Sequence, residues 1–226
     1  LPLRHYTYRI VYIPETIGSL VYLSRNLDHL KRHVVAGFNV SCVGDDRCYS
    51  YLPSREGNTL SDRAAKHALG HIDKNYVRYT WLDRGSDERQ YCAPGVDLPI
   101  ATIMRSKYGQ YPEYHTSLDD LSFVTPSGLE GGYNALKSAI EVIEANGFPD
   151  AQVLGEPQLG KRGLYPTISQ KGSVDGQVMA MMNLLTYADG QHDLIEIADL
   201  IGVRVPELGE ILERLVESGL LTFRRR

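Results

Sequence analysis

The sequence has little cysteine, no long apolar run and no excess of positive charge. Its three cysteines, Cys42, Cys48 and Cys92, form no C-x-x-C pair, which favours buried thiols in a reducing compartment over a disulfide framework. No stretch approaches the roughly 18 apolar residues that cross a bilayer. The formal net charge of −4 argues against non-specific nucleic-acid binding. We therefore expect a cytoplasmic protein with no membrane partner.

The chain also lacks an initiator methionine and a signal peptide, since it opens on Leu1, Pro2 and Leu3. With 226 residues, of which 42% are hydrophobic, it can bury one large core or two smaller ones. We expect it to be the C-terminal part of a longer protein or a processed product.

Apolar periodicity predicts strands alternating with helices in the larger part of the chain. The expected strands are residues 8–13, 38–43, 76–82 and 98–104, and the expected helices are residues 19–26, 61–72 and 129–146. Such alternation is typical of an α/β domain with a mostly parallel sheet flanked by helices. We place this domain at residues 1–147.

Residues 148–173 differ in composition from what precedes them. They contain several prolines and glycines and no sustained period, which predicts a linker or an extended arm. Residues 174–226 then show three short helical patterns and a final apolar run. This order resembles a winged helix-turn-helix.

The third helix of this final module argues against DNA binding. It carries one cation, Arg214, against four acidic residues: Glu207, Glu210, Glu213 and Glu217. A recognition helix needs cations and amides that face phosphates and base edges. We therefore expect the module to mediate protein contacts, including homo-oligomer formation.

One carboxylate follows the first expected strand. Glu15 lies just beyond residues 8–13, and ligands bind beyond the carboxyl ends of strands in open parallel sheets. A carboxylate there is well placed to take a proton from a metal-bound water. Capping of the following helix is the alternative role, and position alone leaves both open.

One histidine lies in a polar loop after the last expected strand. His115 is surrounded by hydroxyl and carboxylate side chains that are able to orient an imidazole bound to a metal. A surface or capping role is the alternative for a histidine alone. His67 and His71 share a helix face, but no H-E-x-x-H pattern is present, which favours a structural or surface role.

Five short motifs, taken in order, resemble a subfamily of aminopeptidase-like proteins within the zinc aminopeptidase family with co-catalytic metals. They are IPETIGS at 13–19, VGDD at 43–46, GSDERQY at 85–91, YHTSLDD at 114–120 and LGKRGLYP at 159–166. The likeness covers essentially the whole chain. It is closest to aminopeptidase-like proteins of bacterial polysaccharide and secondary-metabolite biosynthesis that carry a C-terminal winged helix. It implies a zinc-peptidase-like fold that lacks its N-terminal metal-ligand motif.

The resemblance implies roles for individual residues. Glu15 matches the general base and His115 matches the last metal ligand. Thr16 and Ser41 stand where that family has acidic ligands, which implies one zinc ion rather than two, with further ligands from outside this chain. Two possible substitute ligands follow in the sequence: Asp45 and Asp46.

A second group of residues is expected to contact substrate: Asp87, Glu88, Arg89 and Tyr91. Glu88 replaces a histidine of the resembled family. Arg89 is suited to clamp a substrate carboxylate through its planar fork. An ordinary surface pair between an arginine and an acid is the alternative.

Three functions compete. The favoured one is a zinc-dependent hydrolase of the aminopeptidase or amidase type, acting on a peptide-like or amide substrate. The alternative is a catalytically degenerate scaffold or binding protein in a biosynthetic pathway, which the replaced ligand positions allow. A DNA-binding regulator comes third, because of the acidic helix.

Overall fold

The computed structural model describes residues 4–164 and 176–225. The chain divides into two compact units, Leu1–Glu144 and Ala145–Arg226. No helix in the described ranges is long and apolar enough to cross a membrane.

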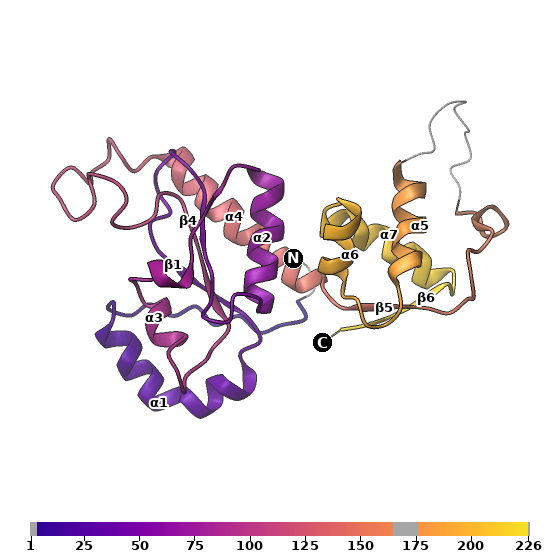
Figure 1. Ribbon diagram of the computed structural model, residues 1–226, viewed down its shortest axis with the longest axis horizontal. Helices are drawn as coiled ribbons and strands as arrows, with labels where there is room; N and C mark the ends of the chain where they lie inside the picture. The colour runs from indigo at the N-terminus through magenta and orange to yellow at the C-terminus, as the bar shows by residue number, and fades with distance from the viewer. Residues whose placement is uncertain (1–3, 165–175, 226) are drawn as a thin grey trace. The chain divides into compact units, whose positions relative to one another are not determined.

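A four-stranded sheet forms the centre of the first unit (Figure 1). Its strands, in spatial order, are β1 (Gly37–Val40), β4 (Ile100–Met104), β2 (Ser50–Leu52) and β3 (Val77–Arg78). The pairs β1–β4 and β2–β3 are parallel, whereas β2 and β4 are antiparallel. The predicted α/β fold with a mostly parallel sheet is confirmed.

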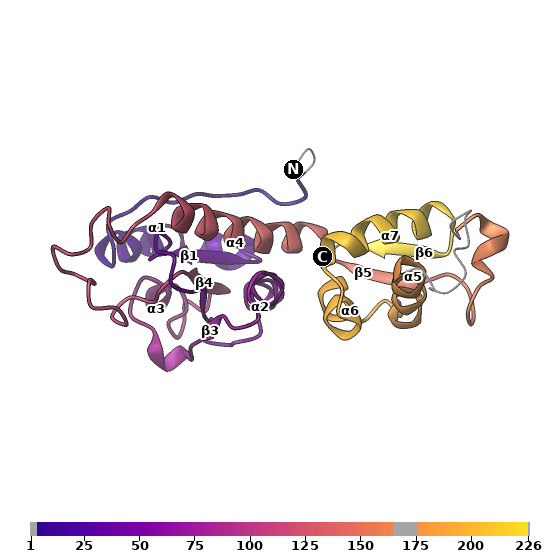
Figure 2. The ribbon, with the colours of Figure 1, turned by 90° about the horizontal axis from the view of Figure 1, so that it is seen from above.

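Helices lie on both sides of this sheet (Figures 1 and 2). On one side are α2 (Leu60–Ile72) and α4 (Pro126–Ala145), which share a buried cluster with the strands. On the other side are α1 (Ile17–His33) and the short α3 (Glu88–Tyr91). The first unit is therefore a layered α/β structure.

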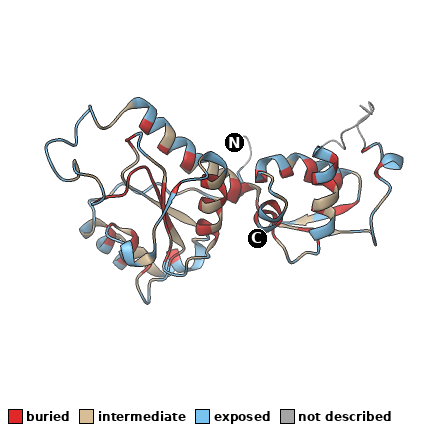
Figure 3. Cartoon of the chain, turned by 45° about the horizontal axis from the view of Figure 1, so that its top comes forward, coloured by how far each residue is buried: buried red, intermediate tan, exposed pale blue. Residues whose placement is uncertain are grey.

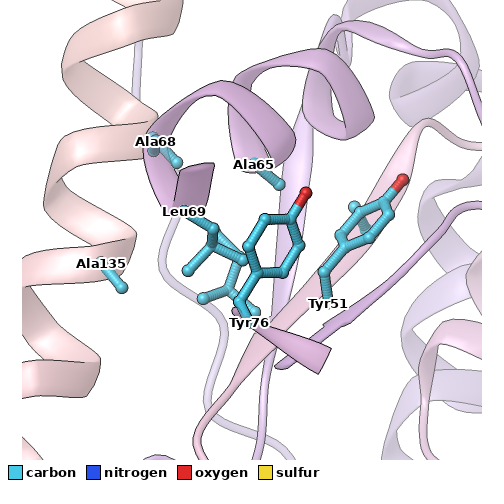
Figure 4. Close-up of a cluster of buried hydrophobic side chains, with 9 residues drawn as sticks. Tyr51, Ala65, Ala68, Leu69, Tyr76 and Ala135 are labelled. Atoms are coloured by element: carbon cyan, nitrogen blue, oxygen red, sulfur yellow. The ribbon is translucent and has the colours of Figure 1, made fainter. Parts of the chain in front are cut away.

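The main core lies between the sheet and the helices α2 and α4 (Figure 4). Its buried members are Tyr51, Ala65, Ala68, Leu69, Tyr76, Ala101, Ile103, Ala135 and Ala139. Successive strand residues face opposite sides of a sheet, so Ala101 and Ile103 of β4 face this core while Ile100 packs against the cluster beside α1. Burial follows the inner helix faces and the strands (Figure 3).

Helix α2 begins one residue before the expected start, because the cap is Thr59 rather than Ser61. The Thr59 side chain accepts a hydrogen bond from the Asp62 backbone N–H, and the Asp62 carboxylate accepts one from the Thr59 N–H, which makes a capping box. Ser61 is buried and donates to the Pro99 carbonyl oxygen at 2.6 Å. The acidic residue three positions after the cap therefore marks the true start of the helix.

The prediction of a strand at residues 8–13 is wrong. These residues form no strand, and Ile10 and Tyr12 are 76% and 92% exposed. A β-rich sequence forms a strand only when another strand supplies hydrogen bonds, and none of the described strands pairs with it. The start of this segment and the residues before it are held instead by the Glu144 carboxylate, which accepts from the backbone of His5 and from the Tyr8 hydroxyl.

Other elements differ from the expectation in length. The strand expected at 76–82 contains only β3 and then a 3-10 turn, Trp81–Asp83. The three-residue β2 was not expected at all. Helix α4 starts at Pro126, since proline fits the first turn of a helix, where backbone N–H groups have no intrahelical partner.

The second unit is a winged helix. Its elements are β5 (Phe148–Ala151), α5 (Gly176–Tyr187), α6 (Leu194–Ile201), α7 (Val205–Glu217) and β6 (Leu221–Arg224). A capping box at Asp193 begins α6, and Gly202 ends it with a φ of 71°. The four glutamates of α7 are exposed.

The segment expected as a linker, residues 148–173, contains a strand. Its first residues form β5, which pairs antiparallel with β6, from Phe148 opposite Arg224 to Ala151 opposite Leu221. This pairing places the start of the segment inside the second unit rather than in a linker. Residues 165–173 of the expected linker, and Val174, lie outside the described residues.

Replacing Asp62 with alanine should lower the free energy of unfolding by about 3 kcal/mol, because buried donors lose their acceptor. The Asp62 carboxylate is fully buried and accepts from the Tyr51 hydroxyl and from backbone and hydroxyl groups of Ser54 and Thr59. Urea unfolding measures the change. Glu56→Ala, at an exposed acid, is the control and should cost under about 0.5 kcal/mol. Equal losses in both variants would contradict a buried network.

Candidate functional site at the ends of strands β1 and β4

The candidate site lies beyond the carboxyl ends of the parallel strands β1 and β4. Cys42 follows β1, and the Arg105 backbone N–H, directly after β4, donates to the Cys42 carbonyl oxygen at 2.8 Å. Ligands bind at such strand ends in open α/β sheets. The long loop from β4 to α4 starts here and carries His115 (Figure 1).

The turn that carries Glu15 is held by the segment of α3. The Thr16 backbone N–H donates to the Asp87 carboxylate at 2.7 Å, and the Arg89 guanidinium donates to the Thr16 hydroxyl oxygen at 2.8 Å. Thr16 has a φ of 59°, in the left-handed region that favours glycine. Glu15 itself is exposed. The structure thus brings together Glu15 and two of the residues expected to contact substrate.

Tyr91 lies at the end of the same short helix and is half-buried. Its hydroxyl oxygen accepts from the Ser19 hydroxyl at 3.2 Å, so it links α3 to the first turn of α1. Burial raises the pKa of the Tyr91 phenol, although the bond from Ser19 lowers it. The group therefore stays protonated and neutral at physiological pH.

Glu88, also expected to contact substrate, is enclosed by hydrogen-bond donors in the structure. Its side chain is fully buried, and its carboxylate accepts from the backbone N–H groups of Gly85 and Ser86 at 2.8 and 3.0 Å. It also accepts from the Tyr108 hydroxyl at 2.7 Å and from the Asn39 amide at 3.0 Å. A carboxylate closed to solvent and bonded to four donors holds the loop in place.

His115 lies in an exposed turn, stacked on its neighbour. The ring centroids of Tyr114 and His115 are 3.9 Å apart, with an angle of 17° between the planes. His115 has a φ of 57°. Burial raises the pKa of Tyr114, and the charges of Cys42 and then Glu15 raise it further. Tyr114 is therefore close enough to Glu15 to feel its charge while its ring covers His115.

The loop around His115 is anchored at two points. Glu113 forms an ion pair with Arg47, with 2.7 Å between Nη2 and Oε1. The Tyr111 ring contacts Phe123 with centroids 4.9 Å apart, and the Tyr111 hydroxyl lies 3.5 Å from the Cys42 sulfur. These contacts join the loop to the segment that follows β1.

The two possible substitute ligands have structural partners. Asp45 is 2% exposed and accepts from the Arg47 N–H and from the N–H and hydroxyl of Ser106. Asp46 accepts from the hydroxyls of Thr125 and Ser127 at the start of α4. These bonds lower the pKa of Asp46, the Thr125 bond most strongly. Both carboxylates therefore fix the loop after β1 to its neighbours.

The described residues do not make a metal site by themselves. Within residues 4–164 and 176–225, no group of three or more His, Cys, Asp or Glu side chains is arranged to hold a metal ion. A catalytic zinc takes about three protein ligands. Asp45 and Asp46 are committed elsewhere, so His115 is left without a partner ligand of this kind nearby.

Three neighbouring side chains were not expected in the site: Cys42, Lys107 and Tyr111. Cys42 and Tyr111 contact each other, and Cys42 has a φ of 50°. Lys107 is 6% exposed and follows β4 by three residues. The sequence signal for these residues was their position, since Cys42 and Lys107 each lie within three residues of the end of a strand of the sheet.

Comparison with known proteins identifies the family of the chain. The family described as Domain of unknown function (DUF4910) matches residues 2–146, more than half of the chain. The chain belongs to the DUF4910 family. Residues 148–223 also match a winged helix-turn-helix family.

One relative of this DUF4910 chain carries an aminopeptidase-like name. A Clostridium acetobutylicum protein, provisionally named a polysaccharide biosynthesis protein with an aminopeptidase-like domain, is 36% identical over 217 residues. The match covers 96% of this chain and 50% of that protein. The chain therefore spans about half the length of this relative, and the resemblance stated from the motifs is confirmed.

One solved structure shows the same fold over most of the chain, and others are similar over part of it. A crystal structure from Clostridium acetobutylicum, provisionally named a peptidase, has a TM-score of 0.82 and 33% identity, covering 93% of this chain and 47% of that chain. An aminopeptidase from Aneurinibacillus sp. strain AM-1 has a TM-score of 0.45 and 20% identity, covering 55% of this chain and 29% of that chain.

Replacing Asp87 with alanine should release the turn at Thr16, because the N–H loses its acceptor. We expect faster hydrogen exchange at the Thr16 amide and a loss of about 1 kcal/mol in the free energy of unfolding. Asp120→Ala is a matched control, since Asp120 is exposed and its side chain accepts hydrogen bonds from its near neighbour Ser122. Unchanged exchange at Thr16 in Asp87→Ala would show that Asp87 does not hold the turn.

Proposed function

We propose that this DUF4910 chain forms part of the active site of a hydrolase that cleaves an amide or peptide bond, with Glu15 as the general base. The observation that supports the proposal most is the placement of Glu15. It is exposed, sits on a turn held by Asp87 and Arg89, and is close enough to Tyr114 to raise the pKa of that phenol. A positioned carboxylate of this kind accepts a proton from a water that attacks a carbonyl carbon.

The proposal gives His115 the role of one zinc ligand. Its imidazole is exposed and its ring is positioned by the stack on Tyr114. Because the described residues contain no group of three or more side chains arranged to hold a metal ion, the proposal takes the remaining ligands from outside them. Because the chain spans half of its relative, the complete protein is the form in which zinc must be measured.

A catalytically inactive scaffold is the second candidate. Two observations favour it: Thr16 and Ser41 occupy positions where the resembled family has acidic ligands, and Asp45 and Asp46 are bonded to other parts of the loop. A scaffold of this type would bind its ligand without hydrolysing it.

The Glu15→Gln variant separates the two candidates. In the whole protein, with aminoacyl 4-nitroanilides and simple amides as substrates, we expect kcat to fall by about 10²–10⁴-fold. Glu56→Gln, at an exposed acid of the same unit, should keep full activity. Zinc content, measured on the same preparation, should be about one ion per protein. A protein with neither bound metal nor hydrolysis of any of these substrates would instead be the scaffold.

The Arg89→Lys variant tests the expected substrate clamp. Lysine keeps the charge but lacks the planar fork, so KM for a substrate with a free carboxylate should rise about tenfold with little change in kcat. Arg84→Lys is the matched control, because Arg84 is exposed and stacks on Trp81. A fall in kcat with unchanged KM would mean that Arg89 acts only through the Thr16 turn.

A further inference from the structure

A lysine is buried beside the candidate site and forms no ion pair with the residues that the structure describes. Lys107 is 6% exposed and lies three residues after the end of β4. Lysine is among the residue types least often buried, and buried lysines are usually paired with an acid. The buried ammonium of Lys107 therefore needs acceptors, either from its own unit or from a ligand.

The contacts of Lys107 satisfy only part of its ammonium group. Nζ donates to the Tyr108 carbonyl oxygen at 3.2 Å, and it lies 4.0 Å from the Tyr108 ring centroid and 5.3 Å from that of Tyr79. An ammonium has three donors, and one carbonyl accepts from only one of them. Within the part of the chain that the structure describes, no carboxylate forms an ion pair with Lys107.

The charged groups that face Lys107 have other partners. Asp83, Glu88 and Cys42 are close enough to favour its charged form. Glu88 already accepts from four donors, and Asp83 accepts from the Thr80 N–H and hydroxyl. Burial outweighs all three and lowers the pKa of Lys107. The site therefore holds a desolvated amine whose positive charge is not neutralised by a direct contact.

The surroundings of Lys107 are those of the candidate site. Tyr108 and Tyr79 belong to an apolar cluster on one face of the sheet, together with Cys42 and Tyr114. Tyr114 in turn stacks on His115 and feels the charge of Glu15. Lys107 thus lies at the strand ends where a ligand of this fold would bind.

We propose that Lys107 binds an anionic oxygen group, a carboxylate or a phosphate, of a small-molecule ligand at this site. The ligand supplies the acceptors that the ammonium lacks. If Lys107 had only a structural role, a methionine of similar length would stabilise the fold more, because burying a charge without a counter-ion costs free energy that an apolar side chain does not. The inference goes beyond the proposed hydrolysis and does not depend on it.

Anion binding at Lys107 predicts proton uptake. An anion favours the charged amine, so its binding raises the pKa of Lys107, and the affinity must be higher at low pH. Above the Lys107 pKa of the free protein, affinity should fall by up to about tenfold per pH unit. The affinity should not depend on pH in this way if the side chain at position 107 cannot lose its proton, as with arginine.

The test is an NMR titration of the whole protein with lysine labelled with ¹³C at Cε. Without added ligand, we expect Lys107 to titrate below Lys137, an exposed lysine paired with Glu141. N-acetylglycine and inorganic phosphate are the two probes, and the one that raises the Lys107 pKa identifies the anion class. The proposal is overturned if Lys107 titrates with or above Lys137 before any probe is added, or if neither probe moves it.

Two variants complete the experiment. Lys107→Met should abolish binding of the effective probe and raise the melting temperature of the unliganded protein, whereas a structural lysine would make it fall. Lys107→Arg should retain binding but lose the pH dependence, because arginine stays charged. Lys137→Met is the matched control and should change neither property. None of these measurements depends on catalytic turnover, so they can be interpreted even if the whole protein hydrolyses no substrate.

Discussion

The buried carboxylate of Glu88 is the constraint on which the arrangement of the candidate site depends. It accepts hydrogen bonds from Asn39 of β1, from the backbone of Gly85 and Ser86, and from Tyr108 after β4. A buried charge is stable only when such donors surround it, so three segments distant in sequence must meet at one point. Because Glu88 is fixed by these bonds, its neighbours Asp87 and Arg89 are fixed too. They in turn hold the turn that carries Glu15.

Elements with local signals could be predicted from sequence, and elements that need a distant partner could not. Helix α2 begins within one residue of its expected range, 61–72, because Thr59 and Asp62 mark its start chemically. Residues 8–13 have the composition of a strand but form none, since strand formation depends on a neighbour that composition does not reveal. The same reason explains β5, which is a strand because β6 pairs with it.

The candidate site was predictable to the same extent. The motifs indicated that Glu15 and residues 87–91 belong to one site, and the structure joins them through Thr16. The motifs did not distinguish exposed residues from buried ones, so Glu88 was expected to contact substrate although its four donors enclose it. For Lys107, nothing in the sequence indicated a role. Its burial without an ion pair among the described residues, seen in the structure, makes it a candidate anion-binding residue.

Backbone conformation adds an argument about how the site is maintained. Four non-glycine residues in the described part of the chain have positive φ, and three of them, Thr16, Cys42 and His115, belong to the candidate site. Each such residue costs about 1 kcal/mol or more and persists only where surrounding contacts over-determine it. For Thr16 these contacts are known: its N–H is held by Asp87 and its hydroxyl by Arg89. The direction of Glu15 is therefore imposed by the fold around α3 rather than by the local preference of its own turn.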